Sequence, residues 1–490
     1  MQQMKKKKFL YTLYSALFIG ICLIPAVTMP LSKNEGTAEN RTLSSKPKLK
    51  TEDGKINISF FNEFDTYFSE HFGLRQNLVT LDGELRTELL GTSSNSDVIA
   101  GRNGWLYYSE TADDFMNTNT LTDRAINNIC HNLGLMNEYC IANNALFLFT
   151  VAPNKNSVYP EYMPYNYIET DAEGNYEKFL RVYNQREDEW MKMMTSSFYN
   201  PEQNVNSCWF SFLDLREVLL NEKSAVNIPL YHKTDTHWNN AGALTARNAL
   251  MNRLGKTECD DFSLAQRSFS YNRSGDLAEM IYPSQKPHEM QIDYGIDFKY
   301  QYIGHFKALD DLLINTVCEG ADGKLLMYRD SFGEAILPFM AESFESAEFT
   351  RAVPYRSTGI SDGTADTVIL EIVERNLGNL QKYAPMYPAP ERVSPETAVN
   401  ITDCEIYCED ANSYHHIYGL IGESENLTDK TIIYVSAGGK TYEAYSCFED
   451  SLLGMEGRFS DRGFSLYIPK TDTNETIDTN AVTVSIVTTE

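Results

Sequence analysis

Apolar and polar positions change their spacing along the chain in a way that separates it into segments. Between about residues 121 and 380, short apolar runs alternate with stretches in which apolar residues recur every three or four positions. The first pattern is typical of buried strands and the second of amphipathic helices. The runs that carry it are "NNICHNLGLMNEYCIANNALFLFTVAP", "WFSFLDLREVLL", "AGALTARNALMNRLG", "KLLMYRDSFGEAILPFMAESF" and "ADTVILEIVERNLGNL". They predict an α/β domain of three layers, with a parallel sheet covered by helices on both faces.

Before this region, the apolar residues of 56–90 keep the helical period, which predicts one or two amphipathic helices with a break at Gly73. The stretch "VIAGRNGWLYYSE", residues 98–110, predicts two short strands joined by a tight turn at Asn103 and Gly104. Residues 98–383 are therefore the expected extent of the α/β domain.

Four prolines within 384–397 interrupt the alternation and predict a linker. Beyond it, "TIIYVSAGGKTYEAYS" reads as a hairpin turning at Gly438 and Gly439, and "GFSLYIP" and "AVTVSIVTT" add further strands. A small β-sandwich over 398–490, a candidate carbohydrate-binding module, fits this spacing.

The N-terminus has the pattern of a membrane anchor. A basic block at Lys5–Lys8 precedes an uncharged run from Phe9 to Ser32, long enough for a bilayer core of about 30 Å. The lysines should stay in the cytoplasm, which places the bulk of the chain outside. We expect residues 1–32 to form an uncleaved transmembrane signal-anchor and 33–97 a tether with the amphipathic helices. A cleaved signal peptide, and hence secretion, is the alternative, although "IPAVTMP" is a poor cleavage site.

Charge and cysteine content narrow the choice of partners. A net charge of -26 with a pI near 4.7 argues against nucleic acid, because phosphate binding needs clustered cations. Nine cysteines are few for 490 residues, so disulfides are permitted but not required. Cys404 and Cys408 have the spacing of half a metal site, but a bridge or free thiols is the favoured interpretation. We expect neither a metal nor a cofactor.

Candidate chemistry lies in "LYHKTDTHWNNAGALTAR", residues 230–247. Residues two apart on an extended segment point to the same side, so Asp235 can orient the imidazole of His237. A structural Asp–His contact and a metal cluster with His232 are the alternatives, and the metal is disfavoured because further ligands are not evident. Asn239 or Asn240 should cap the helix that follows.

A nucleophile is offered by Ser331, which follows an apolar strand and precedes an apolar helix. Ligands bind at the carboxyl ends of such strands, and the N–H groups of a helix start can stabilise an oxyanion. Gly333 would let a substrate approach the backbone closely. The plain alternative for Ser331 is a helix N-cap. Together with Asp235 and His237, however, it completes a serine, histidine and aspartate set.

Six blocks, "GRNGWLYY", "APNKNSVYP", "YHKTDTHWNNAGA", "GDLAEM", "YRDSFG" and "VILEIVER", resemble bacterial SGNH-hydrolase-like proteins. This is the group that contains the alginate O-acetylation proteins and the DHHW proteins. The resemblance spans about residues 98–380. The chain departs from it with Asp-Thr-His-Trp in place of Asp-His-His-Trp, and with Arg329 where many such proteins have glycine. Both positions adjoin the candidate residues and bear on substrate detail.

The resemblance implies an acyl-serine mechanism, with Ser331 as nucleophile, His237 as general base and Asp235 orienting the base. The backbone N–H groups of Ser331 and Gly333 are then candidate oxyanion donors. Asn154 or Lys155, in the "APNK" block, would add to the site.

Arg375 in "VER" is a further candidate for the pocket. Its favoured interpretation is structural, as a partner of Glu371 or Glu374 on a solvated helix end.

The function expected from these residues and the resemblance is an extracytoplasmic O-acetyltransferase acting on a cell-surface or exported polysaccharide. An acetylesterase on such glycans shares the acyl-enzyme and is the first alternative; a noncatalytic glycan-binding or scaffold protein is the second. Transfer also implies an acetyl donor outside the membrane, supplied by a membrane-bound acyltransferase partner. Four C-terminal tyrosines are candidates for stacking on sugars or for the core, and the core is favoured: Tyr414, Tyr418, Tyr434 and Tyr445.

Overall fold

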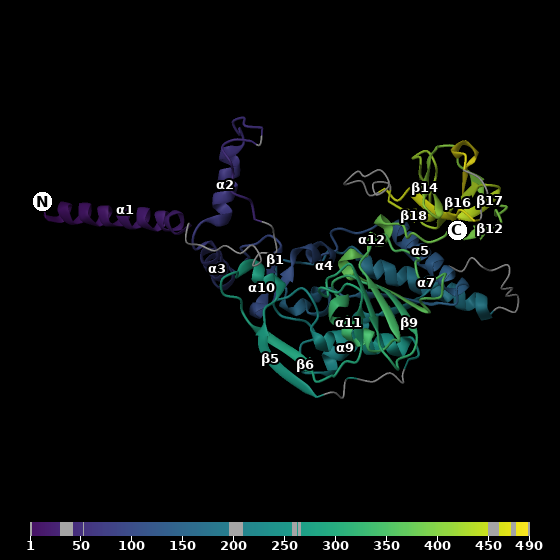
Figure 1. Ribbon diagram of the computed structural model, residues 1–490, viewed down its shortest axis with the longest axis horizontal. Helices are drawn as coiled ribbons and strands as arrows, with labels where there is room; N and C mark the ends of the chain where they lie inside the picture. The colour runs from purple at the N-terminus through teal and green to yellow at the C-terminus, as the bar shows by residue number, and fades with distance from the viewer. Residues whose placement is uncertain are drawn as a thin grey trace.

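The N-terminal helix projects from one end of the molecule, and the C-terminal strands lie at the other (Figure 1). The computed structural model describes residues 2–29, 43–51, 53–195, 209–256, 262, 266–448, 460–471 and 477–488. Helix α1 spans Gln2–Thr28, and its segment Lys7–Thr28 is long and apolar enough to cross a membrane. The expected tether falls in part on residues 30–42, which lie outside the described residues.

The two amphipathic helices expected in 56–90 are α2 (Phe60–His71) and α3 (Arg75–Leu85), the latter running into a π-helical turn at Arg86–Leu90. The chain breaks between them at Gly73, as predicted. The N–H of Gly73 donates to the carbonyl oxygen of Pro25 at 2.8 Å, so the end of α1 lies against this junction.

A seven-stranded sheet with the order β4-β3-β11-β9-β10-β8-β7 forms the centre. Its strands are β3 (Leu146–Ala152), β4 (Ser211–Asp214), β7 (Gln301–Ile303), β8 (Leu313–Val317), β9 (Lys324–Tyr328), β10 (Ser346–Thr350) and β11 (Thr367–Val373). The expected parallel pairing holds from β4 to β10. It is wrong for β8 and β7, which run antiparallel to their neighbours. The links 304–312 and 318–323 are too short for a helical crossover, so each reverses the chain.

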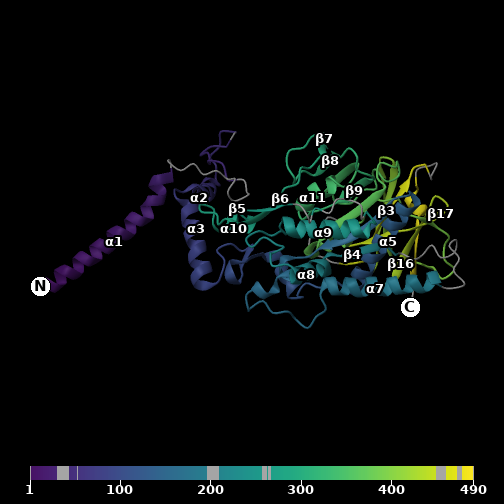
Figure 2. The ribbon, with the colours of Figure 1, turned by 90° about the horizontal axis from the view of Figure 1, so that it is seen from below.

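Helices cover both faces of this sheet, as Figure 2 shows. They include α5 (Asp123–Ala142), α7 (Asn175–Thr195), α8 (Leu215–Ala225), α9 (Asn240–Arg253) and α11 (Gly333–Ala341). Neighbouring strand residues face opposite cores. Leu148 belongs to the buried cluster that includes Leu244 of α9, whereas Phe149 belongs to the other cluster and meets the ring of Phe179 of α7. This alternation makes the three layers.

Shorter elements frame one end of the sheet. They are the hairpin β1 (Val98–Ala100) and β2 (Leu106–Tyr108), the hairpin β5 (Arg267–Arg273) and β6 (Glu289–Tyr294), and the helices α4 (Ala112–Phe115), α6 (Lys155–Val158), α10 (Asp276–Ile281) and α12 (Asn379–Lys382). The first hairpin turns at Asn103 and Gly104 with positive φ angles of 58° and 75°, as expected from the sequence. The second hairpin was not predicted.

The C-terminal strands form two antiparallel sheets around a core of their own. One sheet has the order β12-β17-β16-β20-β13 and the other β14-β15-β19-β18. The strands are β12 (Glu391–Arg392), β13 (Val399–Asn400), β14 (Cys404–Ala411), β15 (Tyr414–Ile421), β16 (Thr431–Ala437), β17 (Lys440–Glu443), β18 (Tyr445–Cys447), β19 (Gly463–Pro469) and β20 (Thr483–Thr488). The expected hairpin at Gly438 and Gly439 joins β16 to β17.

Within these sheets Cys404 and Cys408 are free thiols that pack against the core. Tyr434 and Tyr445 are buried, as the core interpretation expects. Tyr414 and Tyr418 are partly exposed on β15.

The proline-rich segment is packed rather than free. Tyr387 is fully buried, with its hydroxyl 2.8 Å from that of Tyr328 on β9. Within the same segment, Arg392 of β12 holds Glu138 of α5 through two hydrogen bonds of 2.7 and 2.6 Å. The C-terminal sheets therefore dock on α5, while the residue boundaries of the segments stay a prediction.

Candidate active site

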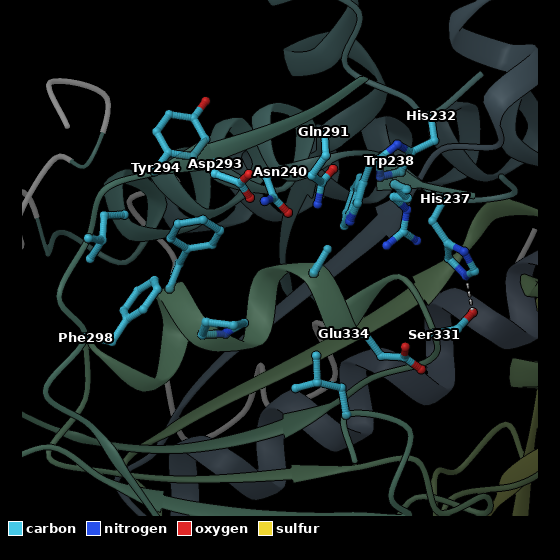
Figure 3. Close-up of a pocket in the computed structure, with 16 residues that line it drawn as sticks. His232, His237, Trp238, Asn240, Gln291, Asp293, Tyr294, Phe298, Ser331 and Glu334 are labelled. Carbon is cyan, nitrogen blue, oxygen red and sulfur yellow. Dashed lines mark hydrogen bonds between the residues drawn. The ribbon is translucent and has the colours of Figure 1, made fainter. Parts of the chain in front are cut away.

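The three residues singled out in the sequence lie in one hydrogen-bonded row, of which Figure 3 shows the contact between His237 and Ser331. Asp235 Oδ1 lies 2.8 Å from His237 Nδ1, and His237 Nε2 lies 2.9 Å from the hydroxyl oxygen of Ser331. The backbone N–H of His237 also donates to Asp235 Oδ1 at 3.0 Å. With Nδ1 protonated toward the carboxylate, Nε2 is free to accept the serine proton.

The N-cap interpretation of Ser331 is wrong. The residue that precedes α11 is Phe332, not Ser331. The serine hydroxyl instead faces His237, which leaves it available for chemistry.

The loop that carries His237 is anchored by the two residues that follow the histidine. Asn239 caps α9 as predicted, because its side-chain oxygen accepts from the N–H groups of Ala241 and Gly242. Trp238 is buried and donates its indole N–H to the carbonyl oxygen of Phe332 at 3.0 Å. The loop is thereby tied to the turn that carries Ser331.

That turn is fixed by Asp330, which sequence reasoning left without a role. Its Oδ1 accepts from the N–H of Phe332 at 2.8 Å, and its Oδ2 accepts from the N–H of Val373 at the end of β11 at 2.7 Å. The carboxylate therefore joins two strand ends and sets the direction of Ser331.

Two further residues from the 273–276 segment support Asp235. Arg273 donates from Nη2 to Asp235 Oδ2 at 2.8 Å. Asp276 accepts from the N–H of Thr236 at 2.7 Å, and its other oxygen lies 3.8 Å from His237 Nδ1. In the sequence, only the block "GDLAEM", which contains Asp276, pointed to this residue.

Burial and neighbouring charges have opposite effects on the pKa values of Asp235 and His237. Burial alone would raise the pKa of Asp235, but its hydrogen bond to His237 and the charges of His237 and Arg273 hold it well below its ordinary value. Burial likewise lowers the pKa of His237, but the hydrogen bond and charge of Asp235, with the charge of Asp276, raise it above 6.5 overall. The imidazolium that forms when His237 takes a proton is therefore stabilised.

Asp235, His237 and Asp276 each offer one ligand atom within 4.8 Å of the others, a spacing that a cation can use. Arg273 already supplies positive charge to this group, and His237 Nδ1 is engaged by Asp235. His232 is not a member of the cluster, contrary to the sequence alternative. It is buried, and burial together with Arg273 lowers its pKa to about 3.

Lys155 does not line the cavity beside Ser331; it holds the Asp235 loop from behind. Its buried ammonium donates to the carbonyl oxygens of His232 and Lys233, each at 3.2 Å, and of Asp235 at 2.6 Å. Burial lowers the pKa of this lysine to about 8, against the charges of Asp235 and nearby carboxylates. Lys155 thus contacts the backbone of the Asp235 loop and is not part of the cavity lining.

Asn154 is also absent from the described cavity lining. Its backbone N–H donates to Glu374 Oε2 and its side-chain amide donates to Asp114 Oδ2, both at 2.8 Å. Its side chain is buried, so the expected contribution to the pocket is not seen.

The expected ion pair of Arg375 with Glu371 or Glu374 is wrong. Both glutamates are buried between the layers rather than on a solvated helix end, and Glu371 accepts from the N–H of Asp330. The Arg375 guanidinium instead lies over the rings of Phe332 and Tyr108, at 5.8 and 5.4 Å.

Gly333 serves packing rather than ligand approach. A Cβ at this position would lie 2.7 Å from both Cβ and Cδ of Arg329, whose stem fills the space. Arg329 in turn donates to the carbonyl oxygen of Leu309 at 2.5 Å. The N–H of Gly333 remains at the start of α11, where helix N–H groups have no intrahelical acceptor.

A cavity of about 370 Å³ opens beside Ser331 and His237. The β6 strand, the start of α9 and helix α11 supply most of its walls. Its lining consists of His232, His237, Trp238, Asn240, Arg273, Gln291, Asp293, Tyr294, Ile296, Phe298, Leu309, Ser331, Glu334, Ala335, Pro338 and Phe339.

No protein-family model and no curated protein matches the chain. It is similar to three solved structures: PatB1 of Bacillus cereus (16% identity, 57% of this chain and 96% of that one, TM-score 0.41), a DHHW family protein of Eubacterium siraeum (15%, 52% and 87%, 0.38) and the O-acetyltransferase domain of Pseudomonas putida AlgJ (16%, 57% and 92%, 0.33). The DHHW protein and AlgJ belong to the groups that the sequence blocks resemble. Identities and TM-scores this low leave the function to be argued from the site itself.

Proposed function

We propose that this chain is an extracytoplasmic O-acetyltransferase that acts on a cell-surface or exported polysaccharide through an acetyl-serine intermediate. The observation that carries the proposal is the row Asp235–His237–Ser331 at the edge of a cavity of about 370 Å³. A serine, a base within hydrogen-bond reach and an acid that orients the base are the elements of acyl transfer.

In the first step His237 Nε2 takes the proton of Ser331, and the serine oxygen attacks the carbonyl carbon of an acetyl ester. The resulting oxyanion is met by the backbone N–H groups of Ser331 and Gly333 at the start of α11. As the intermediate collapses, the bond to the donor oxygen breaks and His237 returns its proton to that leaving oxygen. Ser331 is left acetylated.

In the second step a sugar hydroxyl enters the cavity and gives its proton to His237 as its oxygen attacks the acetyl carbon. Collapse then releases the acetylated sugar, and the proton returns to Ser331. Water in place of the sugar gives hydrolysis, the reaction of an acetylesterase. The two activities share every protein group and differ only in the nucleophile of this step.

The apolar segment Lys7–Thr28 supports membrane attachment, with the preceding lysines on the cytoplasmic side. An acetyl donor must then reach the outer side of the membrane. A membrane-bound acyltransferase partner that presents an acetyl ester meets this need.

The test uses the full chain in detergent with 4-nitrophenyl acetate and an oligosaccharide. Ser331→Ala and His237→Ala should each lower release of 4-nitrophenol by about a thousandfold or more. The control variants are Ser224→Ala and His305→Ala, which remove the same side-chain types from exposed positions and should keep the full rate. Acetyl recovered on Ser331 and then on sugar supports the transferase.

Acetate as the sole product, with an acetyl-Ser331 intermediate, identifies an esterase. Equal, negligible rates for the wild type and both site variants would overturn the enzymatic proposal and favour the glycan-binding or scaffold interpretation.

A further inference from the structure

The cavity beside Ser331 has polar groups that the acetyl transfer does not use. Gln291 and Asp293 enter it from β6, Asn240 from the start of α9, and Glu334 from α11 (Figure 3). Because the acetyl group itself is small and neutral, these side chains are available to the acceptor.

Three buried polar atoms of the lining have no hydrogen-bond partner among the described residues: Nδ1 of His232, Oε1 of Gln291 and Nε of Arg273. The glutamine oxygen is an acceptor and the arginine N–H is a donor. A buried polar atom without a partner costs about 1–3 kcal/mol, so a ligand that satisfies it gains affinity. A hydroxyl group both donates and accepts, and it can therefore serve either atom.

The part of the lining that is available to the acceptor carries negative charge, from Asp293 and Glu334. Its one arginine, Arg273, is already neutralised by Asp235 at 2.8 Å, and no lysine appears among the described lining residues. Asp293 is an exposed carboxylate that accepts from the hydroxyl of Ser270 at 3.1 Å. Glu334 has its nearest cation, Arg351, at 3.3 Å, and Arg351 is not part of the lining.

Aromatic rings complete the far wall. Phe298 and Tyr294 both pack against Phe339, with ring centroids 5.7 and 6.3 Å apart. Ring faces and edges of this kind suit the apolar C–H surface of a sugar ring.

We propose that this cavity is the acceptor site for an uncharged sugar residue and that Asp293 and Glu334 exclude sugars bearing a carboxylate. This inference rests on the proposed transferase function. A uronate here would meet these two carboxylates, while the one Lys or Arg side chain among the described lining residues, Arg273, is already paired with Asp235 at 2.8 Å. The net charge of the chain, -26, adds to this repulsion. A neutral sugar meets only hydrogen-bonding groups and rings.

The experiment compares acetyl transfer from 4-nitrophenyl acetate to neutral β-linked gluco-oligosaccharides and to oligogalacturonates of the same length, at low ionic strength. Each transfer rate is divided by the rate of acetate release by the same preparation. The expected ratio for the neutral acceptor exceeds that for the uronate at least tenfold. Adding salt should narrow this difference, since screening weakens the repulsion.

A charge reversal tests the residue assignment. Asp293→Lys should raise the transfer ratio of uronate to neutral acceptor at least fivefold. The matched control is Asp410→Lys, a reversal at another exposed strand aspartate, on β14, which should leave that ratio at the wild-type value.

Equal transfer to both acceptors by the wild type, or an equal shift in both variants, would overturn the inference. Hydrolysis with no transfer to either acceptor also overturns it, while the serine chemistry stands. Absence of acetate release altogether is the separate failure of the proposed function.

Discussion

Trp238 donates its indole N–H to the carbonyl oxygen of Phe332 at 3.0 Å. Trp238 follows the proposed base, and Phe332 follows the proposed nucleophile, so one hydrogen bond links the two loops that must stay in register. The two rings also meet edge to face, with centroids 5.1 Å apart. The tryptophan of the Asp-Thr-His-Trp block therefore has a geometric role that its position beside His237 does not itself reveal.

Replacing Trp238 with Phe should lower kcat for acetyl-ester cleavage roughly tenfold with little change in KM, because the Nε2-to-Oγ alignment loosens while the cavity remains. The loss of one buried hydrogen bond should cost about 1 kcal/mol of stability. Steady-state kinetics and a thermal melt measure both. Tyr231→Phe is the control, since it removes a comparable buried bond, to Pro153, without unlinking the loops. Similar losses of kcat in the two variants would contradict the linking role.

The pH profile should report His237. Its pKa is raised above 6.5 against the effect of burial, chiefly by Asp235 and then by Asp276. Since the base must be unprotonated, kcat/KM should fall as the pH drops through that raised value. Asp276→Asn removes one source of the shift, so the acid limb should move to lower pH. Glu279→Gln on the same helix should leave the limb in place. An unmoved or rising limb in Asp276→Asn would refute the assignment.

Lys155 should affect stability and catalysis together. Lys155→Met removes one donor from three loop carbonyl oxygens, of which only that of Lys233 keeps another donor among the described residues, the N–H of Leu106. It should destabilise the fold by about 2–4 kcal/mol while lowering kcat. Lys223→Met, which loses an exposed ion pair to Glu161 and one carbonyl contact, is the milder control.

The contribution of Lys155 to folding stability should depend on pH, because its pKa is lowered to about 8 from the 10.5 of an ordinary lysine. Between these values the unfolded chain binds more protons, so this residue's contribution to stability should rise with pH from 8 to 10.5. Denaturant unfolding across that range should show the rise in the wild type and not in Lys155→Met. Parallel curves would contradict it.

The sequence was sufficient where the decisive relations are local. Ser331 lies three residues past the end of β9, and Asp235 and His237 stand two residues apart, so strand ends and side-chain alternation made them candidates. The Asn239 cap and the turn at Asn103 are likewise set within a few residues.

Contacts between residues far apart in the sequence could not be predicted in this way. Arg273 meets Asp235 across 38 positions of sequence, from a strand, β5, most of whose residues are exposed and follow no alternation. The role of Lys155 depends on three carbonyl groups about 80 residues downstream, and backbone oxygens leave no trace in a sequence. Arg375 was misassigned because Glu371 lies on a strand buried along its whole length.

The docking of the C-terminal sheets on α5 should be acid-sensitive through Glu443. This buried carboxylate of β17 lies 2.9 Å from His131 of α5 and 2.7 Å from Arg392. Burial would raise its pKa, but those two partners lower it to about 2 from an ordinary 4.5. A carboxyl group whose pKa is lower in the folded state than in the unfolded chain stabilises the fold at pH values above the unfolded pKa. Here that stabilisation is about 3 kcal/mol, and it is lost as the pH falls from 4.5 toward 2.

Glu443→Gln should therefore be less stable at neutral pH and should lack that part of the acid loss, which urea unfolding at a series of pH values measures. Glu391→Gln, which breaks the more exposed pair with Lys440, should keep the wild-type acid profile. If Glu443→Gln lost stability with acid in parallel with the wild type, the His131–Glu443–Arg392 cluster would not be what holds the C-terminal sheets to α5. The bidentate contact of Arg392 with Glu138 would then carry the docking, and Glu138→Gln would become the more damaging substitution.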